Sequence, residues 1–443
     1  HYPLRRQRQM CIRDSQNAVS LMGGGGGWPL SVFIMPDRTP FFGGTYFPPD
    51  DRYGRPGFLK VLRSVSEFYR TRQGEVREYG SRILNALKAE VLRAGDLSRD
   101  SLEHACNAML EHVDAVNGGF GAAPKFPMPG ALEFLLRRAA TRKDAAARSA
   151  ATKMLDAMQR GGFHDHLGGG FHRYSVDEAW LVPHFEKMAD DNAWLLRNYI
   201  DAYAIFGDES YRETAEGIIR FFREVLSDPT GGFSASQDAD VTPDDEGGYF
   251  TWTDHDLQRS LTIDEYQVIS LHYLHDRGSL HHDPEKKVLC AAVDPPAIAA
   301  ELGIPEERVN TLLAQGREKL LSERNGRETP FVDRTLYTSL NGMCITSFLK
   351  AYRVLEDQEL RDYALTALDR ILRERVKGHA LEHCEGVPAV LDDHVYLIEA
   401  LVAAYEATGD RSRLDLAAAW MERGIERFGD QAGGFFDTET EVL

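Results

Sequence analysis

The sequence predicts a mainly α-helical protein in which pairs of helices are joined by recurring glycine turns. A Gly-Gly-Phe or Gly-Gly-Tyr triplet occurs six times, and amphipathic stretches with helical spacing lie between the triplets. A turn that recurs between pairs of helices is typical of a helical array or toroid. Only the part before residue 98 has a different pattern, with strands as well as helix. The triplets begin at Gly118, Gly161, Gly169, Gly231, Gly247 and Gly433.

The composition excludes several classes of partner. The chain has 443 residues, and its 51 Lys and Arg against 69 Asp and Glu give a net charge of −18. Such an acidic surface disfavours nucleic acids and anionic membranes, and no segment approaches the ~20 apolar residues that cross a bilayer. Five scattered cysteines without a Cys-x-x-Cys pair suit reduced thiols in the cytoplasm. We therefore expect a cytoplasmic protein that binds neither nucleic acid nor membrane.

The first elements belong to a short α/β region. Residues 1–15 are basic but lack the apolar core of a secretory signal, so we treat them as a foreign or disordered segment. An apolar run predicts a strand over 30–35, a Pro-Asp turn follows, and a second strand covers 40–42. A helical pattern then runs from 56 to about 92. Two strands and a helix are too few for a closed domain, so residues 16–95 are predicted to be part of one.

From residue 98 the pattern is almost entirely helical, with about nine main helices. Short Gly-Asp or Glu-Asp joints at 207–208, 356–357 and 409–410 predict tight helical hairpins. An irregular insertion over 231–336 predicts a strand pair at 233–236 and 248–252, with helices over 253–274 and 305–323. The main helices are predicted at 98–116, 130–142, 145–160, 183–206, 208–227, 339–356, 358–376, 392–408 and 411–428.

Residues 161–192 form the densest cluster of chemically active side chains. Pro183 is able to start a helix, which would place His184 in the first turn and Asn192 on the apolar stripe. In a functional interpretation, His172 and His184 are acid–base catalysts, Trp180 and Phe171 offer flat faces to a sugar ring, and Arg173 binds its oxygens. Further binding residues would be His164, Asp165, His166, Glu186 and Lys187, together with Asn192.

The alternative is that the same residues form a polar lattice that fixes a glycine-rich loop. We favour a ligand site, because so many ionisable groups are costly for a loop alone. A metal at His164, His166 and His172 is a weaker option, since a lone His-x-His lacks the helical spacing of zinc enzymes. We expect neither a metal nor another cofactor.

Two further clusters complete the candidate site. Asp238 and Asp240 lie on one side of an extended segment and are followed by Glu246, Tyr249 and Trp252. Paired carboxylates suit glycoside hydrolysis, but aspartates also stabilise plain turns. The third cluster is Asp392 and Asp393, which equally suit a helix cap, and Asn341 is a weaker candidate.

Three stretches resemble the YyaL / spermatogenesis-associated family. They read GGWPLSVFIMPDRTPFFGGTYFPP, GGFHDHLGGGFHRYSVDEAWLVPHFEKMADDNAWLL, and GGFSASQDAD with EGGYFTW. The resemblance implies a thioredoxin-like domain joined to an (α/α)6 toroid similar to six-hairpin glycosidases and N-acylglucosamine 2-epimerases. It also implies a small-molecule carbohydrate as the partner. Residues 98–443 would then be an incomplete toroid.

The sequence departs from the family pattern in three places. The thioredoxin half that carries Cys-x-x-Cys is missing upstream, and a lone Cys11 cannot replace a redox pair. Trp28-Pro29 would match the proline beside a thioredoxin active site. Leu340 stands where the family often has Trp, and the last hairpins are missing.

Three functions follow as hypotheses. The first is a sugar epimerase or isomerase with His172 and His184 as acid–base groups. The second is a glycoside hydrolase that uses carboxylates such as Asp238 or Asp392. The third is a binding or scaffold protein without catalysis, with a redox role in the full-length thioredoxin domain.

Overall fold

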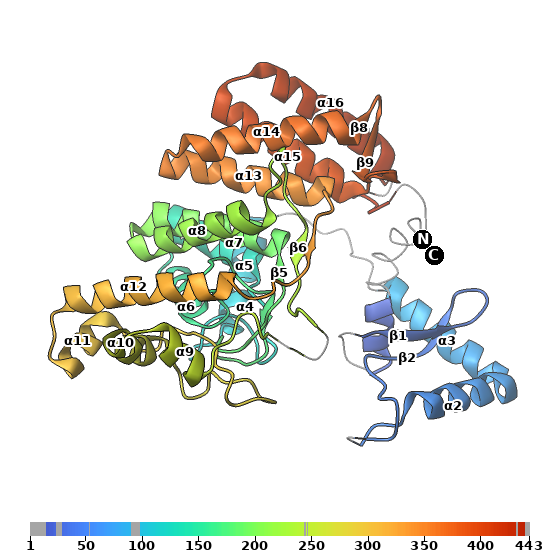
Figure 1. Cartoon of the computed structure of the whole chain (residues 1–443). Coiled ribbons are helices and arrows are strands. Elements are labelled where there is room, and N and C mark those ends of the chain that lie inside the picture. The colour runs from blue at the N-terminus through green and yellow to red at the C-terminus, as the bar shows by residue number, and fades with distance from the viewer. Residues whose placement is uncertain are drawn as a thin grey trace. The chain divides into compact units, whose positions relative to one another are not determined.

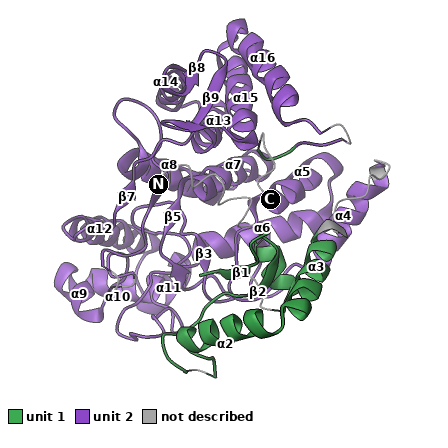
Figure 2. Cartoon of the chain, turned by 90° about the vertical axis from the view of Figure 1, so that its right-hand side faces the viewer, with its two compact units in different colours: residues 1–97, 436–443 green, residues 98–435 purple. Residues whose placement is uncertain are grey.

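The structure is a computed structural model that describes residues 15–23, 29–52, 54–89, 98–242, 245, 247–430 and 433–438. The chain divides into two compact units, residues 1–97 with 436–443 and residues 98–435 (Figure 2). Cys11, Trp28 and Glu246 lie outside the described residues, so what the sequence predicts for them stays a prediction.

The first unit contains the predicted strands and a divided helix. β1 (Ser31–Ile34) pairs antiparallel with β2 (Pro40–Gly44), which confirms the two strands. The helix predicted over 56–92 is two helices, α2 (Phe58–Thr71) and α3 (Gln73–Ala89), because Arg72 leaves the helical conformation with φ −131°. Strand and helix side chains share a small core of Met35, Phe41, Val61, Val65 and Val76.

The second unit begins with α4 (Arg99–Glu111) and continues with four hairpins of long helices. The first helices of the hairpins, α5, α7, α13 and α15, pack side by side as an inner layer, and each packs on its own partner from α6, α8, α14 and α16 (Figure 1). This arrangement confirms the predicted helical-hairpin array. The bounds are α5 (Pro129–Arg142), α6 (Ala145–Arg160), α7 (Ala189–Phe206), α8 (Glu209–Phe221), α13 (Thr338–Leu355), α14 (Gln358–Arg375), α15 (Leu391–Thr408) and α16 (Arg411–Phe428).

All four hairpins close through the same two-residue joint. The residue after the first helix is left-handed, with φ of 52°, 70°, 59° and 73° in chain order. An Asp follows and caps the second helix by accepting a backbone N–H hydrogen bond. The joints at Gly207, Glu356 and Gly409 confirm the sequence prediction, and the fourth begins at Lys143.

Four of the six glycine triplets build one type of corner. Both glycines have positive φ, between 71° and 102°, which disfavours any side chain there. A preceding Asp accepts the N–H of the first glycine and donates its own N–H to the carbonyl of the second. Gly161, with φ −69°, and Gly248 belong to turns of other types. The four corners contain Gly118, Gly169, Gly231 and Gly433.

Residues 183–188 are strands, not helix. β3 (Tyr174–Ser175) pairs antiparallel with β4 (Pro183–His184), and β5 (Lys187–Met188) follows at once. The predicted helix over 183–206 therefore begins only at Ala189, and the placement of His184 in its first turn is wrong. The backbone of 183–188 is engaged by strands that lie far away in the sequence, which outweighs local helical preference.

A three-stranded sheet lies at the N-terminal ends of two inner helices. β6 (Ser236–Gln237) pairs antiparallel with β5 on one side and β7 (Val332–Asp333) on the other. The predicted pairing of 233–236 with 248–252 is wrong, because Trp252 bridges to Lys287 instead. β5 leads directly into α7, and β7 leads into α13, so this sheet holds the entrance of both helices.

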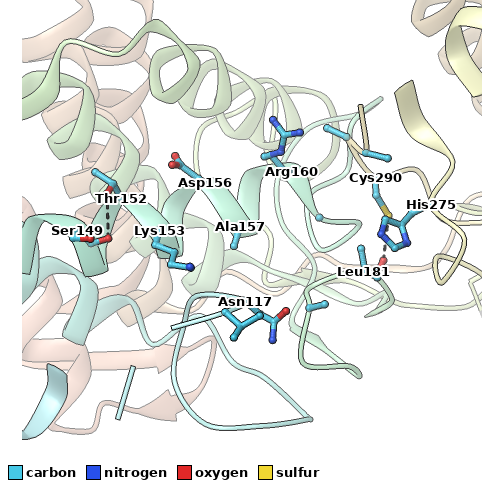
Figure 3. Close-up of a pocket in the computed structure, with 15 residues that line it drawn as sticks. Asn117, Ser149, Thr152, Lys153, Asp156, Ala157, Arg160, Leu181, His275 and Cys290 are labelled. Atoms are coloured by element: carbon cyan, nitrogen blue, oxygen red, sulfur yellow. Dashed lines mark hydrogen bonds between the residues drawn. The ribbon is translucent and has the colours of Figure 1, made fainter. Parts of the chain in front are cut away.

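The insertion over 231–336 carries its own helices and core. The helix predicted over 253–274 divides where Thr262 caps a new helix, and the helix predicted over 305–323 is confirmed as α12. α11 is a helix that the sequence did not predict. The insertion also borders a groove beside α6 (Figure 3). The bounds are α9 (Asp254–Ser260), α10 (Ile263–Tyr273), α11 (Pro295–Leu302) and α12 (Glu306–Asn325).

A small hairpin joins α14 to α15. Its strands are β8 (Val376–Lys377), β9 (Ala380–Cys384) and β10 (Val387–Pro388), with β9 in the middle. The sequence analysis missed these strands.

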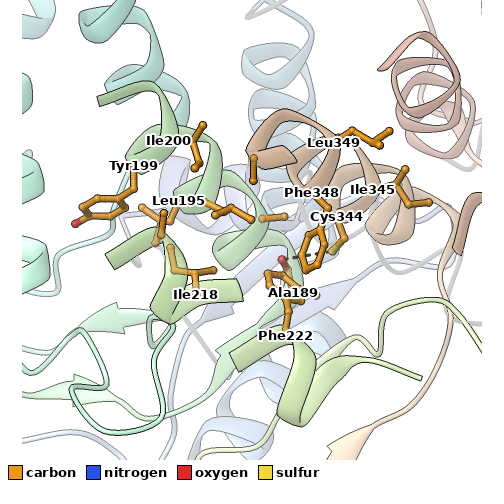
Figure 4. Close-up of a cluster of buried hydrophobic side chains, with 14 of the residues drawn as sticks. Ala189, Leu195, Tyr199, Ile200, Ile218, Phe222, Cys344, Ile345, Phe348 and Leu349 are labelled. Atoms are coloured by element: carbon orange, nitrogen blue, oxygen red, sulfur yellow. Dashed lines mark hydrogen bonds between the residues drawn. The ribbon is translucent and has the colours of Figure 1, made fainter. Parts of the chain in front are cut away.

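The main core fills the space between the inner helices and their outer partners. Side chains from α7, α8 and α13 meet there, including Leu195, Ile218 and Phe348 (Figure 4). The ring of Phe222 packs edge-on against Phe348 at 5.5 Å between centroids. The inner helices are thereby held at fixed positions, and so are the loops at their N-terminal ends.

Candidate functional site

The structure divides the candidate residues of 161–192 into a buried lattice and an exposed group. Asp165 is the centre of the lattice: its Oδ2 accepts from Lys187 Nζ at 2.6 Å and its Oδ1 accepts from Arg324 Nη1 at 2.8 Å. Burial alone would raise the pKa of Asp165, but the charges of Arg324 and Lys187 outweigh it and hold that pKa well below its usual range. Burial also lowers the pKa of Lys187 to about 8. This carboxylate is fully engaged inside the protein.

The same clamp recurs at two other corners. In each, a cation binds the corner Asp and also the carbonyl of the first glycine, as Lys187 binds Asp165 and Gly169. The recurrence favours a structural role for Lys187 and Asp165 over the predicted binding role. The equivalent sets are Lys125 with Asp114 and Gly118, and Arg370 with Asp228 and Gly231.

Two buried asparagines are also structural repeats of each other. Asn192 in α7 accepts the N–H of Phe171 at 2.7 Å and donates to its carbonyl at 2.9 Å. Asn341 in α13 does the same to Phe233, at 2.8 Å and 3.1 Å. Each asparagine thus fastens the aromatic residue of a corner to an inner helix. Both side chains are 0% exposed, so neither is placed to bind a substrate.

The three histidines near Asp165 line a very small cavity. His172 is buried and His164 and His166 are half-buried around a volume of about 10 Å³, which is room for roughly one water molecule. Burial lowers the pKa of His172 to about 3 and that of His166 to about 4, so both rings are neutral. His172 Nδ1–H donates to the carbonyl of Phe185 at 2.8 Å. A sugar cannot reach His172 here, which argues against its predicted catalytic role.

The aromatic residues predicted to stack on a sugar are in the core. Phe171, Trp180 and Trp252 are each 0% exposed, and Tyr249 is 9% exposed. Trp180 Nε1–H donates to the carbonyl of Gly118 at 3.3 Å, so its polar edge is satisfied within the fold. These four rings offer no open face to a ligand.

The exposed group gathers at the β5–β6–β7 sheet. Lys187 lies opposite Gln237 and Met188 opposite Ser236, and Glu186 and Asp238 directly flank these pairs, where the charge of Glu186 acts on Asp238. Carboxylates close together on neighbouring antiparallel segments repel one another. Partial burial and the charge of Glu186 raise the pKa of Asp238. The sequence predicted both residues as site candidates, and the structure brings them together.

Two more carboxyl groups lie next to them in the first turn of α7. Asp190 and Asp191 are half-buried, and Asp190 Oδ1 has no hydrogen-bond partner among the residues described. Burial and the neighbouring charge of Asp190 raise the pKa of Asp191 to about 8. The pair therefore shares one proton at neutral pH. Sequence reasoning missed both as functional residues, because it began the helix at residue 183 and so placed both aspartates in the helix interior.

We define the carboxylate cluster as Glu186, Asp190, Asp191 and Asp238. Two further side chains, Arg173 and His184, lie beside it. Arg173 Nη1 donates to Glu186 Oε2 at 2.6 Å, and His184 Nε2 lies 3.7 Å from the same oxygen. The neighbouring His184 and Arg173 together lower the pKa of Glu186. His184 remains 33% exposed and Arg173 44% exposed, so both remain accessible.

The remaining candidates, Asp392, Asp393 and Asp240, differ in their exposure to solvent. Asp392 is exposed in the first turn of α15, and its charge, like that of Asp190, helps to raise the pKa of the partly buried Tyr396. Asp393 is fully buried, where His383 donates to it at 2.9 Å and Ser339 N–H at 3.0 Å. Asp240 accepts the N–H of Gly247 and shapes a loop. Of these three, Asp392 alone is open to solvent and near the carboxylate cluster.

The groove beside α6 has a volume of about 430 Å³. Lys153, Asp156 and Arg160 border it from α6, and His275 and Cys290 border it from the insertion (Figure 3). Arg160 is paired with Asp294, and burial raises the pKa of the Cys290 thiol to about 12. The groove therefore offers no reactive thiol, and its other cation, Lys153, donates a hydrogen bond to the carbonyl of Ala115.

In the part of the chain that the structure describes, no side chains are arranged as a metal site or as a reactive thiol pair. No group of three or more His, Cys, Asp or Glu side chains there is arranged to hold a metal. Cys106, Cys290, Cys344 and Cys384 are buried, and no two of them form a disulfide. None of the helices described combines the length and the apolar character that a membrane span requires.

The first unit matches a sequence-family model. The model is Thioredox_DsbH, described as a protein of unknown function, DUF255, and it covers residues 8–88. The N-terminal part of the chain is thus thioredoxin-like, as the motif resemblance implies.

Nearly the whole chain also matches curated relatives. Spermatogenesis-associated protein 20 is 33% identical in Homo sapiens and 32% in Mus musculus, over 96% of this chain and 60% of each relative. The uncharacterized protein B0495.5 of Caenorhabditis elegans is 30% identical, over 96% of this chain and 63% of its own length. The chain spans about three fifths of the relatives it matches. These matches confirm the resemblance to the spermatogenesis-associated family.

Solved structures with a similar arrangement of helices include sugar-processing enzymes. Cellobiose 2-epimerase from Bacillus thermoamylovorans B4167 has 11% identity and a TM-score of 0.44, over 74% of this chain and 72% of its own. Unsaturated glucuronyl hydrolase from Bacillus sp. GL1 has 12% identity and a TM-score of 0.47, over 78% and 74%. The fold of this chain is mainly α, with an array of four helical hairpins preceded by a thioredoxin-like part.

Proposed function

We propose that the protein acts on a carbohydrate through acid–base chemistry of the carboxylate cluster. The observation that carries this proposal is the placement of Glu186 close to Asp238, beside the half-buried Asp190 and Asp191. Four carboxyl groups converge there with one ion pair, between Arg173 and Glu186, and such a concentration of like charge at the entrance of the inner helices is typical of a functional site.

The pKa values within the cluster suit glycoside hydrolysis. Asp191 retains its proton at neutral pH because burial and Asp190 raise its pKa, so it is able to protonate a leaving group. Glu186 stays ionised because His184 and Arg173 lower its pKa, so it is able to act as base or nucleophile. Two carboxyl groups with pKa values driven apart are the pattern of glycosidases.

Facing residues of an antiparallel pair have Cβ atoms about 5 Å apart. Glycosidase carboxyl pairs lie about 5–10 Å apart. Glu186 and Asp238, which flank the paired residues of β5 and β6 and interact electrostatically, are therefore also candidates for a catalytic pair. The cluster supports hydrolysis by carboxylates more than epimerisation by His172 and His184, because the His172 ring is buried and cannot reach a sugar.

Epimerase or isomerase chemistry stays a second candidate because of one observation. His184 is partly exposed and lies 3.7 Å from Glu186, a geometry in which it could exchange a proton with a sugar carbon next to a carbonyl. The two candidates share one site and differ in the reacting group.

A binding and turnover experiment tests the proposal. We expect gluco-, manno- and xylo-oligosaccharides of one to four units to include a ligand that raises the melting temperature. Glu186→Gln and Asp191→Asn should reduce its turnover at least 100-fold, while Glu318→Gln on the exposed surface of α12 should not. Hydrolysis would incorporate ¹⁸O from water into the product, whereas epimerisation would incorporate solvent deuterium at carbon. No shift and no turnover across the panel would refute the proposed function.

A further inference from the structure

A row of three rings leads from the surface to the carboxylate cluster. The segment containing Lys125 lies beside β3, because Lys125 and Ser175 exchange backbone hydrogen bonds of 2.8 Å and 2.9 Å. β3 in turn pairs with β4, where Tyr174 lies opposite His184. The segment containing Lys125 thus lies beside the β3–β4 hairpin, which follows much later in the sequence.

Side-chain alternation separates the two faces of this small sheet. Lys125 and Ser175 are each 0% exposed, so their neighbours in sequence, Phe126 and Tyr174, lie on the opposite, open face. The rings of Phe126 and Tyr174 are 4.9 Å apart, and those of Tyr174 and His184 are 5.1 Å apart. Phe126 is 42% exposed. The row is continuous, and its outer end is accessible.

The row ends at an ionised carboxylate and has apolar neighbours. Glu186 follows His184 by two residues and lies 3.7 Å from its ring. Met128 and Val176, two residues beyond Phe126 and Tyr174, are 51% and 45% exposed. An exposed apolar surface of this kind beside a polar cluster is typical of a binding site rather than of a plain loop.

The packing of the loop does not require Phe126. Lys125 already fastens this segment, by its hydrogen bonds to Asp114 and the carbonyl of Gly118. The exposed ring next to it is therefore available for another purpose. A pyranose has an apolar C–H face and polar edges, and it matches an aromatic row that ends in carboxylates.

We propose that Phe126 and Tyr174 form an apolar subsite for a second sugar ring, next to the ring bound at the carboxylate cluster. This inference rests on the proposed function and narrows its substrate to an oligosaccharide. It also replaces the sequence-predicted stacking residues, Trp180 and Phe171, which are buried.

Calorimetric titration of the folded protein with matched mono-, di- and tetrasaccharides tests the subsite. Phe126→Ala should weaken tetrasaccharide binding about tenfold and leave monosaccharide binding unchanged. Phe126→Trp should restore the affinity. Phe126→Leu keeps most of the apolar volume and therefore guards against a folding defect. Ile263→Ala, at an 86% exposed position of the insertion, is the control.

The possible results distinguish failure of the subsite from failure of the proposed function. Equal affinities of wild type and Phe126→Ala for the tetrasaccharide would overturn the subsite while leaving the proposed function intact. An equal loss for monosaccharide and tetrasaccharide would also overturn it, because the effect would then lie at the carboxylate cluster. No binding of any sugar by the wild type would refute the proposed function and the subsite with it.

Discussion

The Asp165 lattice and the carboxylate cluster are both rich in charge, yet the two are built in opposite ways. Asp165 is held by two buried cations, Lys187 and Arg324, and its pKa is lowered. In the carboxylate cluster, burial and like charges raise the pKa of Asp191 and Asp238. The first region is fully compensated and closed, whereas in the second Arg173 compensates Glu186 alone by an ion pair and the cluster is partly exposed.

The difference shows that the density of ionisable residues in a sequence does not identify a functional site. The lattice contains the most conspicuous motif, but its contacts recur at the Lys125 and Arg370 corners, where no catalytic cluster was predicted. The cluster is less conspicuous because its members come from separate segments. Compensation of charge is therefore a better guide than number of charges.

The largest effect should follow from removing a cation of the lattice. Lys187→Met leaves Asp165 with a single buried partner, and we expect a loss of about 3–5 kcal/mol in the free energy of unfolding, measured by urea denaturation. Lys125→Met should cost a comparable amount at its own corner. If Lys187→Met instead kept full stability and abolished sugar binding, the lattice would be the functional site and the comparison would be reversed.

The two regions should respond to acid with opposite signs. The buried histidines have lowered pKa values in the folded state, so the unfolded state binds more protons between about pH 6.5 and 4, and stability falls as the pH falls. Asp191 has a raised pKa, so between about pH 8 and 4 the folded state binds more protons, and stability rises as the pH falls. Between pH 7 and 5.5 each of these histidines contributes roughly 1 kcal/mol, and Asp191 contributes roughly 2 kcal/mol.

Urea denaturation of variants at the two pH values separates these contributions. His166→Gln should lose less stability than the wild type on acidification, and Asp191→Asn should lose more. His112→Gln, at an exposed position of α4, serves as the control. Changes of the same sign in His166→Gln and Asp191→Asn would contradict the contrast between the regions.

A matched pair of effects should come from the corner asparagines. Asn192→Ala and Asn341→Ala each leave a buried backbone N–H and carbonyl without their side-chain partner. We expect each to cost about 2 kcal/mol of unfolding free energy, and the two costs to be similar. A much larger effect of Asn192→Ala on binding than on stability would restore the predicted binding role of Asn192.

The sequence predicted those parts of the structure that depend on neighbours in the chain. The hairpin joint at Gly207 needs only a left-handed residue and a capping Asp, both of which are visible locally. The strands at 183–188 depend on β3 and β6, and the latter lies about 50 residues away in the sequence. Local preference therefore suggested helix there, and the position of His184 was predicted wrongly.

The candidate site was predicted in part for the same reason. Glu186 and Asp238 were both proposed as site residues, but their proximity arises from a strand register that no local pattern encodes. Conversely, His172 and Trp180 have the chemistry of a site and the burial of a core. Residue type predicted what each side chain could do, and only packing decided whether a ligand could reach it.

The smallest expected effect is the sharpest test of the carboxylate cluster. Asp238 lies close to Glu186 and is exposed, so Asp238→Asn removes a repulsion and should raise the free energy of unfolding by about 0.2–0.5 kcal/mol. The gain should vanish in 1 M salt, which screens exposed charges, and in a Glu186→Gln background. If sugar turnover falls while stability rises, the repulsion is maintained for function. A loss of stability would instead make Asp238 part of the structural framework.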